Sequence, residues 1–127
     1  MLDVDFVITT HDEIISQIGG LPGLGSGGRA GIESALGRIE NHAAYAGLDD
    51  VFGIASMYAV AIAQGHVFTD GNKRTGLTCA LAYLEQQGIQ IQRTSALEEL
   101  MVDIAEHQLD KDGFANVLSA IWVQANP

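Results

Sequence analysis

The chain has 127 residues, of which 47% are hydrophobic, and this size and composition suit one compact domain with a single core. Its formal net charge of −10 predicts a surface that repels DNA, RNA and anionic membranes at long range, so we expect no direct binding to nucleic acid or membrane. Residues 1–127 are therefore predicted to form one domain.

Two further features of the composition limit where the protein works. The sequence contains no predominantly apolar run near the ~20 residues that a membrane-spanning helix needs, and its first residues lack the zones of a signal peptide. Cys79 is the only cysteine and lies among apolar residues, which predicts a small core residue without a disulfide. We expect a soluble, intracellular protein.

The first predicted helix spans roughly residues 10–19. Thr10 and Glu13 form a capping-box pattern, isoleucines follow at helical spacing, and Gly19 and Gly20 end the segment. The stretch that follows, GGLPGLGSGGRAG, has too much glycine and proline for regular structure and is predicted to be a loop. This loop is either a plain connector or a segment that closes over a site.

Two helices are predicted next. Apolar residues from Ile32 to Ile39 mark an amphipathic helix that ends near residues 41–45. The segment LDDVFGIASMYAVAIAQG then begins with Asp49 and Asp50, which suit a helix N-terminus, and continues apolar on nearly every face. That pattern is typical of a helix buried in the middle of a bundle.

A fourth helix is predicted over NKRTGLTCALAYLEQQG, with Gly88 as its stop. The segment IQIQR alternates like a strand, but a lone strand cannot form a sheet, so we expect an extended connector. Ser95 and Glu98 form a second capping box, which predicts a helix from there to about Gln108.

The last predicted helix is capped by either Asp110 or Asp112. It carries Phe114 and Trp122, which either close the core or help to form a groove for a partner. With almost no strand, the pattern as a whole predicts an all-α bundle of about six helices.

The stretch GHVFTDGNKRTGL, residues 65–77, is the main candidate for a functional site. It lies between the end of the buried helix and the start of the next, where free backbone N–H groups and the helix dipole attract anions. Gly71 allows close approach of a phosphate, Asn72 offers an amide, and Lys73 and Arg74 add positive charge. This pattern predicts a site for a nucleotide di- or triphosphate, although two cations at a helix start are often only solvated.

The remaining polar residues of this stretch each have two interpretations. Asp70 is a candidate ligand for phosphate-bound Mg²⁺, or else the N-cap of the next helix. His66 is a candidate general base, or else it stabilises the preceding helix C-terminus. Phe68 is interpreted as an anchor in the core. The other histidines are predicted to be surface or structural residues on amphipathic helices: His11, His42 and His107.

The order H-x-F-x-D-G-N-K-R resembles the signature of the Fic/Doc family, whose loops transfer part of a nucleotide to a protein hydroxyl. This resemblance implies a helical Fic/Doc fold, with ATP as substrate and Mg²⁺ as cofactor. By this resemblance His66 is the base, Phe68 the anchor and Asp70 the metal ligand. The phosphate cradle is formed by Gly71, Asn72, Lys73 and Arg74.

Two departures from that signature resemble the Doc toxins within the family. Lys73 stands where adenylyl-transferring members have a second glycine, and Leu77 stands where they have a last arginine. Further likeness covers most of residues 11–92. The resemblance implies a protein kinase that moves the γ-phosphate of ATP to a threonine of translation elongation factor Tu and so stops translation. Two alternatives stay open, which are adenylyl transfer by the same residues and a non-catalytic module that binds an antitoxin or another peptide.

The resemblance also implies how such a toxin is restrained. Family members with a built-in inhibitory helix carry the pattern [ST]-x-x-x-E-[GN], and the nearest fits here, beginning at Thr9, Thr94 and Ser95, are incomplete. An inhibitor in trans is therefore expected, namely a Phd-type antitoxin with a segment that folds on binding. A cytoplasmic protein encoded by a bacterium or phage is implied.

Overall fold

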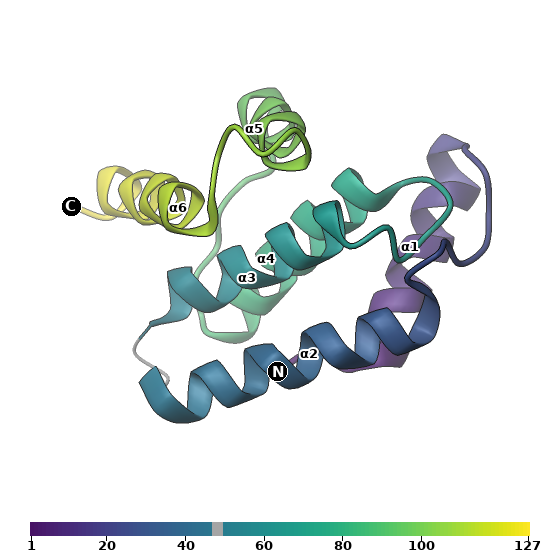
Figure 1. Cartoon of the computed structure of the whole chain (residues 1–127). Coiled ribbons are helices and arrows are strands. Elements are labelled where there is room, and N and C mark those ends of the chain that lie inside the picture. The colour runs from purple at the N-terminus through teal and green to yellow at the C-terminus, as the bar shows by residue number, and fades with distance from the viewer. Residues whose placement is uncertain (47–49) are drawn as a thin grey trace.

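The computed structural model describes residues 1–46 and 50–127. Within these residues the chain forms six α-helices and no strand longer than one isolated bridge (Figure 1). The helices are α1 (Val4–Ile18), α2 (Gly28–Ala46), α3 (Val51–Gln64), α4 (Asn72–Gln86), α5 (Ser95–Ala105) and α6 (Lys111–Ala125). The predicted all-α bundle of about six helices is confirmed. None of the described helices is both long and apolar enough to span a membrane.

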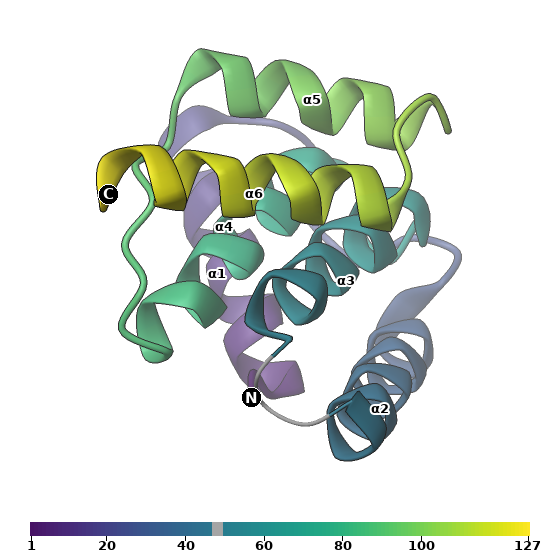
Figure 2. The ribbon, with the colours of Figure 1, turned by 90° about the vertical axis from the view of Figure 1, so that its left-hand side faces the viewer.

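Helix α3 occupies the centre of the bundle. It packs against α2, α4, α5 and α6, while α1 packs against α4 and α2. Figures 1 and 2 show α5 and α6 on one side of the α3–α4 pair and α2 on the opposite side. The near-continuous apolar sequence of α3 is explained by this position, since neighbouring helices cover it from several directions.

The α3–α4 pair is closely packed because small residues line its contact. Ala55, Ala59 and Ala63 are buried at four-residue spacing along α3. On the facing helix, a Cβ added at Gly76 would lie 2.9 Å from the carbonyl oxygen of Ala59, closer than real Cβ atoms approach backbone. Glycine at this position lets the two backbones meet. The short connection between the helices, which carries the candidate motif, therefore joins two closely packed helices.

The start of the first helix was predicted wrongly. Helix α1 begins at Val4, and the side chain of Asp3 caps it by accepting a hydrogen bond from the Phe6 N–H at 2.8 Å. Thr10 lies inside the helix and is buried, so the pattern formed by Thr10 and Glu13 is not a cap. An aspartate ahead of an apolar residue is an equally good start signal, and here it is the one that operates.

Two other helix starts also differ from the prediction. Helix α2 begins at Gly28, within the stretch that was expected to be loop. Helix α5 is capped by Thr94 and not by Ser95, because the Thr94 hydroxyl accepts the hydrogen bond from the Leu97 N–H at 3.2 Å. The same helix ends at Ala105, before the expected residue.

Other local predictions are confirmed. Gly88 has φ +80° just beyond α4, as a glycine stop requires, and residues 89–93 form no regular structure. Asp110 caps α6 by accepting from the Gly113 N–H at 2.8 Å. Cys79 and Phe114 are buried core residues, whereas Trp122 is half-buried. The predicted N-terminal role of Asp49 falls outside the described residues.

Candidate active site

The motif loop, residues 65–71, connects α3 to α4 through two unusual backbone conformations. His66 has φ +50° directly after the end of α3, and Gly71 has φ +79° directly before α4. A Cβ at Gly71 would lie 3.2 Å from Ile15 Cδ1 and 3.4 Å from His11 Cδ2, so both conformation and space favour glycine there. The positive φ of His66, a residue with a Cβ, marks a conformation that the surrounding contacts must hold in place.

A glycine-rich loop, residues 19–27, holds the motif loop by antiparallel pairing. The Gly25 N–H donates to the Val67 carbonyl at 2.9 Å, and the Gly27 N–H donates to the His66 carbonyl at 3.0 Å. In the other direction, the Thr69 N–H donates to the Gly23 carbonyl at 3.0 Å. The glycine-rich loop is thus more than a connector, since it braces the segment that carries the candidate base.

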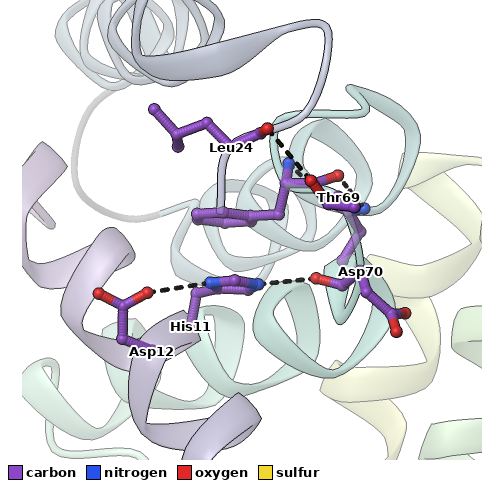
Figure 3. A network of polar contacts seen from close by, with 7 residues as sticks. His11, Asp12, Leu24, Thr69 and Asp70 are labelled. Carbon is purple, nitrogen blue, oxygen red and sulfur yellow. Dashed lines mark hydrogen bonds and ion pairs between the residues drawn. The ribbon is translucent and has the colours of Figure 1, made fainter. Parts of the chain in front are cut away.

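The pairing is tight enough to require glycine. A Cβ added at Gly25 would lie 2.5 Å from the carbonyl oxygens of both His66 and Phe68. The side chain of Thr69 adds a further bond to this pairing by donating to the Leu24 carbonyl at 3.1 Å (Figure 3).

Phe68 is the anchor that the sequence predicted. Its side chain is 3% exposed and stacks on the ring of His11, with ring centroids 3.7 Å apart and planes within 2° of parallel. His11 was expected to be a surface or structural residue on an amphipathic helix; it is fully buried against the motif loop. Because its partners are far away in the sequence, only the folded structure brings this contact to light.

Asn72 closes the motif loop on itself. Its side-chain oxygen accepts from the Phe68 N–H at 3.1 Å, and its side-chain amide donates to the Phe68 carbonyl at 2.9 Å. These two bonds engage the amide group that was predicted to contact a phosphate. The first role of the Asn72 side chain is therefore to hold the loop, while its backbone N–H lies in the first turn of α4.

Asp70 presents an exposed carboxylate beside the start of α4. One carboxylate oxygen accepts from the Gly71 N–H at 2.9 Å, and the other accepts from the Leu21 N–H at 3.2 Å. The hydrogen bonds from Leu21 and Gly71, followed by the charges of Lys73 and Arg74, lower the pKa of the Asp70 carboxyl below its ordinary value. The N-cap position of α4 is taken by Gly71, and no side-chain capping bond is formed there, so the capping interpretation of Asp70 is wrong.

The residues of the motif converge on one cavity of about 540 Å³, a volume within the range of about 300–1,000 Å³ that is usual for small-molecule sites. The predicted site residues that line it are His66, Asp70, Gly71, Asn72, Lys73 and Arg74. Phe68 lies in the core and does not line the cavity. Every predicted residue except the anchor therefore faces the same space.

The sequence interpretation missed other residues that line this cavity. Arg93, Glu98 and His107 reach it from the connector before α5, from α5 itself and from the residues just after α5. Arg93 donates to the Thr78 hydroxyl at 2.6 Å and to a Glu98 carboxylate oxygen at 2.9 Å. With Lys73 and Arg74, Arg93 brings three of the six basic residues of an acidic chain to one cavity.

The donor groups at the cavity fit a metal ion that arrives on a phosphate. The described residues contain no cluster of three or more histidine, cysteine, aspartate or glutamate side chains suited to hold a metal alone. Mg²⁺ in phosphate-transfer sites is commonly held by one or two carboxylates together with phosphate oxygens and water. The exposed carboxylate of Asp70, which its lowered pKa keeps ionised, lies beside the start of α4 and has the chemistry of such a ligand.

Comparison with known proteins agrees with this geometry. A model of the Fic/DOC family matches residues 1–84, which include the motif loop and both segments that brace it. The chain is also 38% identical over 119 residues to the protein named "Protein kinase doc" of Escherichia phage P1, a match that covers 94% of this chain and 93% of that relative. The likeness thus extends beyond the span of residues 11–92 first noted. The chain belongs to the Fic/DOC family.

Proposed function

We propose that this protein is a Doc-type toxin and a protein kinase, which transfers the γ-phosphate of ATP to a hydroxyl group of a target protein. The carrying observation is that His66, Asp70 and the cationic start of α4 line one cavity of about 540 Å³. The 38% identity to a relative named as a protein kinase supports phosphate transfer as the reaction.

The start of α4 is the proposed phosphate cradle. The first N–H groups of a helix lack partners within the helix and carry the positive end of its dipole, so they bind anions. Gly71, Asn72, Lys73 and Arg74 all line the cavity at this point. Backbone N–H groups would bind phosphate oxygens, and Lys73 and Arg74 would offset their charge.

Asp70 is the proposed ligand of Mg²⁺ that enters with ATP. Its pKa is lowered, so its carboxylate stays ionised at neutral pH and available to a cation. When bound, Mg²⁺ supplies charge neutralisation to the phosphates during transfer. The chain's own contribution is to hold that carboxylate in place, through the N–H groups of Gly71 and Leu21.

His66 is the proposed general base. It is exposed at the cavity, and an imidazole there is placed to accept a proton from an incoming hydroxyl group. The target hydroxyl oxygen forms a bond to the γ-phosphorus while its proton passes to His66. The bond from the γ-phosphorus to the bridging oxygen breaks at the same stage, and ADP leaves.

The partners are proposed on the family resemblance. The target is a threonine of translation elongation factor Tu, and the inhibitor is a Phd-type antitoxin that binds in trans, both in the cytoplasm of a bacterial cell. The sequence contains no complete match to the inhibitory pattern [ST]-x-x-x-E-[GN], which supports an external inhibitor. The net charge of −10 supports a toxin that leaves DNA binding to its partner.

A transfer assay tests this proposal. Purified protein is mixed with elongation factor Tu, Mg²⁺ and ATP labelled on either the α- or the γ-phosphate. We expect label only from the γ-phosphate, its loss in His66→Ala, and its retention in His42→Ala, because His42 lies outside the cavity and pairs with Asp50 at 3.1 Å. Label from the α-phosphate would identify an adenylyltransferase. No transfer, together with tight antitoxin binding, would favour a non-catalytic module.

A further inference from the structure

His11 contacts three positions of the motif loop although it belongs to a different helix. Its ring stacks on Phe68, its Nε2 lies 2.7 Å from the Asp70 carbonyl oxygen, and its Cδ2 lies within 3.4 Å of the position that a Cβ on Gly71 would take. Figure 3 shows the ring of His11 between Asp12 and the backbone of Asp70. The ring is fully buried by the surrounding protein.

The hydrogen bond to Asp70 determines where the His11 ring carries its proton. A carbonyl oxygen only accepts, so Nε2 must be the donor in this bond. The other ring nitrogen, Nδ1, lies 3.3 Å from a carboxylate oxygen of Asp12. The donor state of Nε2 is therefore required by the position of the Asp70 backbone, whichever state Nδ1 adopts.

The position of His11 makes it a fixed reference for the loop. It lies in the middle of α1, a helix that packs against α4. The Asp70 backbone carbonyl is bound from this side, while the Asp70 carboxylate is bound by the N–H groups of Leu21 and Gly71. Asp70 is thus bound at both its backbone and its side chain, and these bonds orient its carboxylate at the cavity.

We propose that His11 is a positioning residue for the reaction, acting through Asp70 and Gly71 to place the metal-binding carboxylate and the start of the phosphate cradle. This proposal rests on the proposed function, since Asp70 is taken as the Mg²⁺ ligand. Mutation of a group that does not bind a metal itself but hydrogen-bonds to a metal ligand typically lowers metal affinity or activity 10–100-fold. His11 is such a group for Asp70, because its Nε2 donates to the Asp70 carbonyl oxygen.

Two variants separate the contacts that His11 makes. His11→Gln keeps a side-chain N–H donor at a reach similar to that of Nε2 but loses the stacked ring. His11→Phe keeps an aromatic ring against Phe68 but leaves the Asp70 carbonyl without its donor. Loss of the hydrogen bond to Asp70 is predicted to change mainly the Mg²⁺ dependence of the transfer rate. Loss of the ring stacked on Phe68 is predicted to change mainly the thermal stability.

The test measures transfer rate against Mg²⁺ concentration at fixed ATP, beside the thermal unfolding midpoint of each variant. In His11→Phe the Mg²⁺ concentration for half-maximal rate should rise roughly tenfold or more, while His11→Gln should stay within about threefold of the wild type. A rate loss in both variants that merely follows their loss of folded protein, with unchanged Mg²⁺ dependence, would overturn the proposal.

A second measurement judges the inference without any activity. Amide hydrogen exchange at Thr69, whose N–H donates to the Gly23 carbonyl, reports on the motif loop directly. His11→Phe should speed exchange at Thr69 while leaving the amides of α6 unchanged, and equal exchange in the variant and the wild type would contradict positioning. If the wild type transfers no phosphate but Thr69 responds as expected, the proposed function fails and the role of His11 in holding the loop stands.

Discussion

Replacing Gly25 by alanine is the sharpest test of the pairing between the glycine-rich loop and the motif loop. The new Cβ would lie 2.5 Å from the carbonyl oxygens of His66 and Phe68. Both atoms belong to the backbone, so no side-chain rotation relieves the overlap and the two segments must separate. The hydrogen bonds from Gly25 to Val67 and from Gly27 to His66 are the first to be lost.

The expected cost follows from those two bonds. Each hydrogen bond contributes about 0.5–1.5 kcal/mol to stability, so losing both should lower the free energy of unfolding of Gly25→Ala by about 1–3 kcal/mol. Gly37→Ala is the matched control, because a Cβ at Gly37 would meet nothing within 4 Å in the middle of α2. That variant should be more stable than the wild type by about 0.5–1 kcal/mol, the usual gain for alanine over glycine within a helix.

The measurement is urea unfolding followed by the fluorescence of Trp122, the only tryptophan in the chain. Transfer activity is recorded on the same samples below the unfolding transition, where Gly25→Ala should also lose activity because His66 is displaced. If Gly25→Ala unfolds within about 0.5 kcal/mol of the wild type, the two loops are not held as described.

Four further outcomes are expected. Asp70→Asn should abolish Mg²⁺-dependent ATP binding in calorimetry, and unchanged binding would remove Asp70 from the metal site. Gly71→Ala and Gly88→Ala share a positive φ near +80° and should each cost about 1–2 kcal/mol in urea unfolding, but only Gly71→Ala should lose ATP binding, since Gly88 lies outside the cavity. Arg93→Leu should weaken ATP binding by roughly tenfold if its charge reaches the phosphates, and an equal affinity would limit Arg93 to its bonds with α4 and α5. Burial raises the pKa of Tyr58 to about 12, so the free energy of unfolding should fall by about 1.4 kcal/mol per pH unit per such group as the pH rises from about 10 towards 12, and in alkaline urea titrations Tyr58→Phe should show a shallower fall.

The parts of the structure that could be predicted from the sequence are those with local causes. The apolar pattern of α3 and the glycine stop at Gly88 depend on neighbouring residues and were found where expected. The aspartate cap of α6 also has a local cause, and Asp110 is one of the two aspartates predicted for it. The convergence of the motif on one cavity also follows from local order, because residues 66–74 lie along one loop and the first turn of one helix.

The predictions that failed involve competition between local signals. Helix α1 is capped by Asp3 and not by Thr10, and the choice between them depends on the core, which buries Val7 of α1 and Leu2 just before the cap. A helix that begins at Val4 places Val7 in the core and buries Thr10 with it. A capping-box pattern carries no information about which side of the helix faces inward, so it could not decide the question.

His11 and Arg93 show a different limit, because their partners are distant in the sequence. A histidine on an amphipathic helix is usually structural, and its stacking on Phe68 depends on how α1 packs against α4. Arg93 gave one usable signal, since only six basic residues occur in the chain and each needs an explanation. Its place at the cavity still depends on the path of the connector from α4 to α5.

The residues that line the cavity fall into two groups, which differ in whether the family model matches them. The motif loop, α1 and the glycine-rich loop all lie within residues 1–84, the part matched by the family model. Arg93 and Glu98 lie beyond it, yet they line the same cavity as Lys73 and Arg74. The residues proposed to carry out the transfer lie in the matched part. The orientation of a bound nucleotide would separate γ-phosphate transfer from adenylyl transfer, and we expect Arg93 and Glu98 to influence it. Combining Arg93→Leu with the α- and γ-labelled assay measures that influence directly.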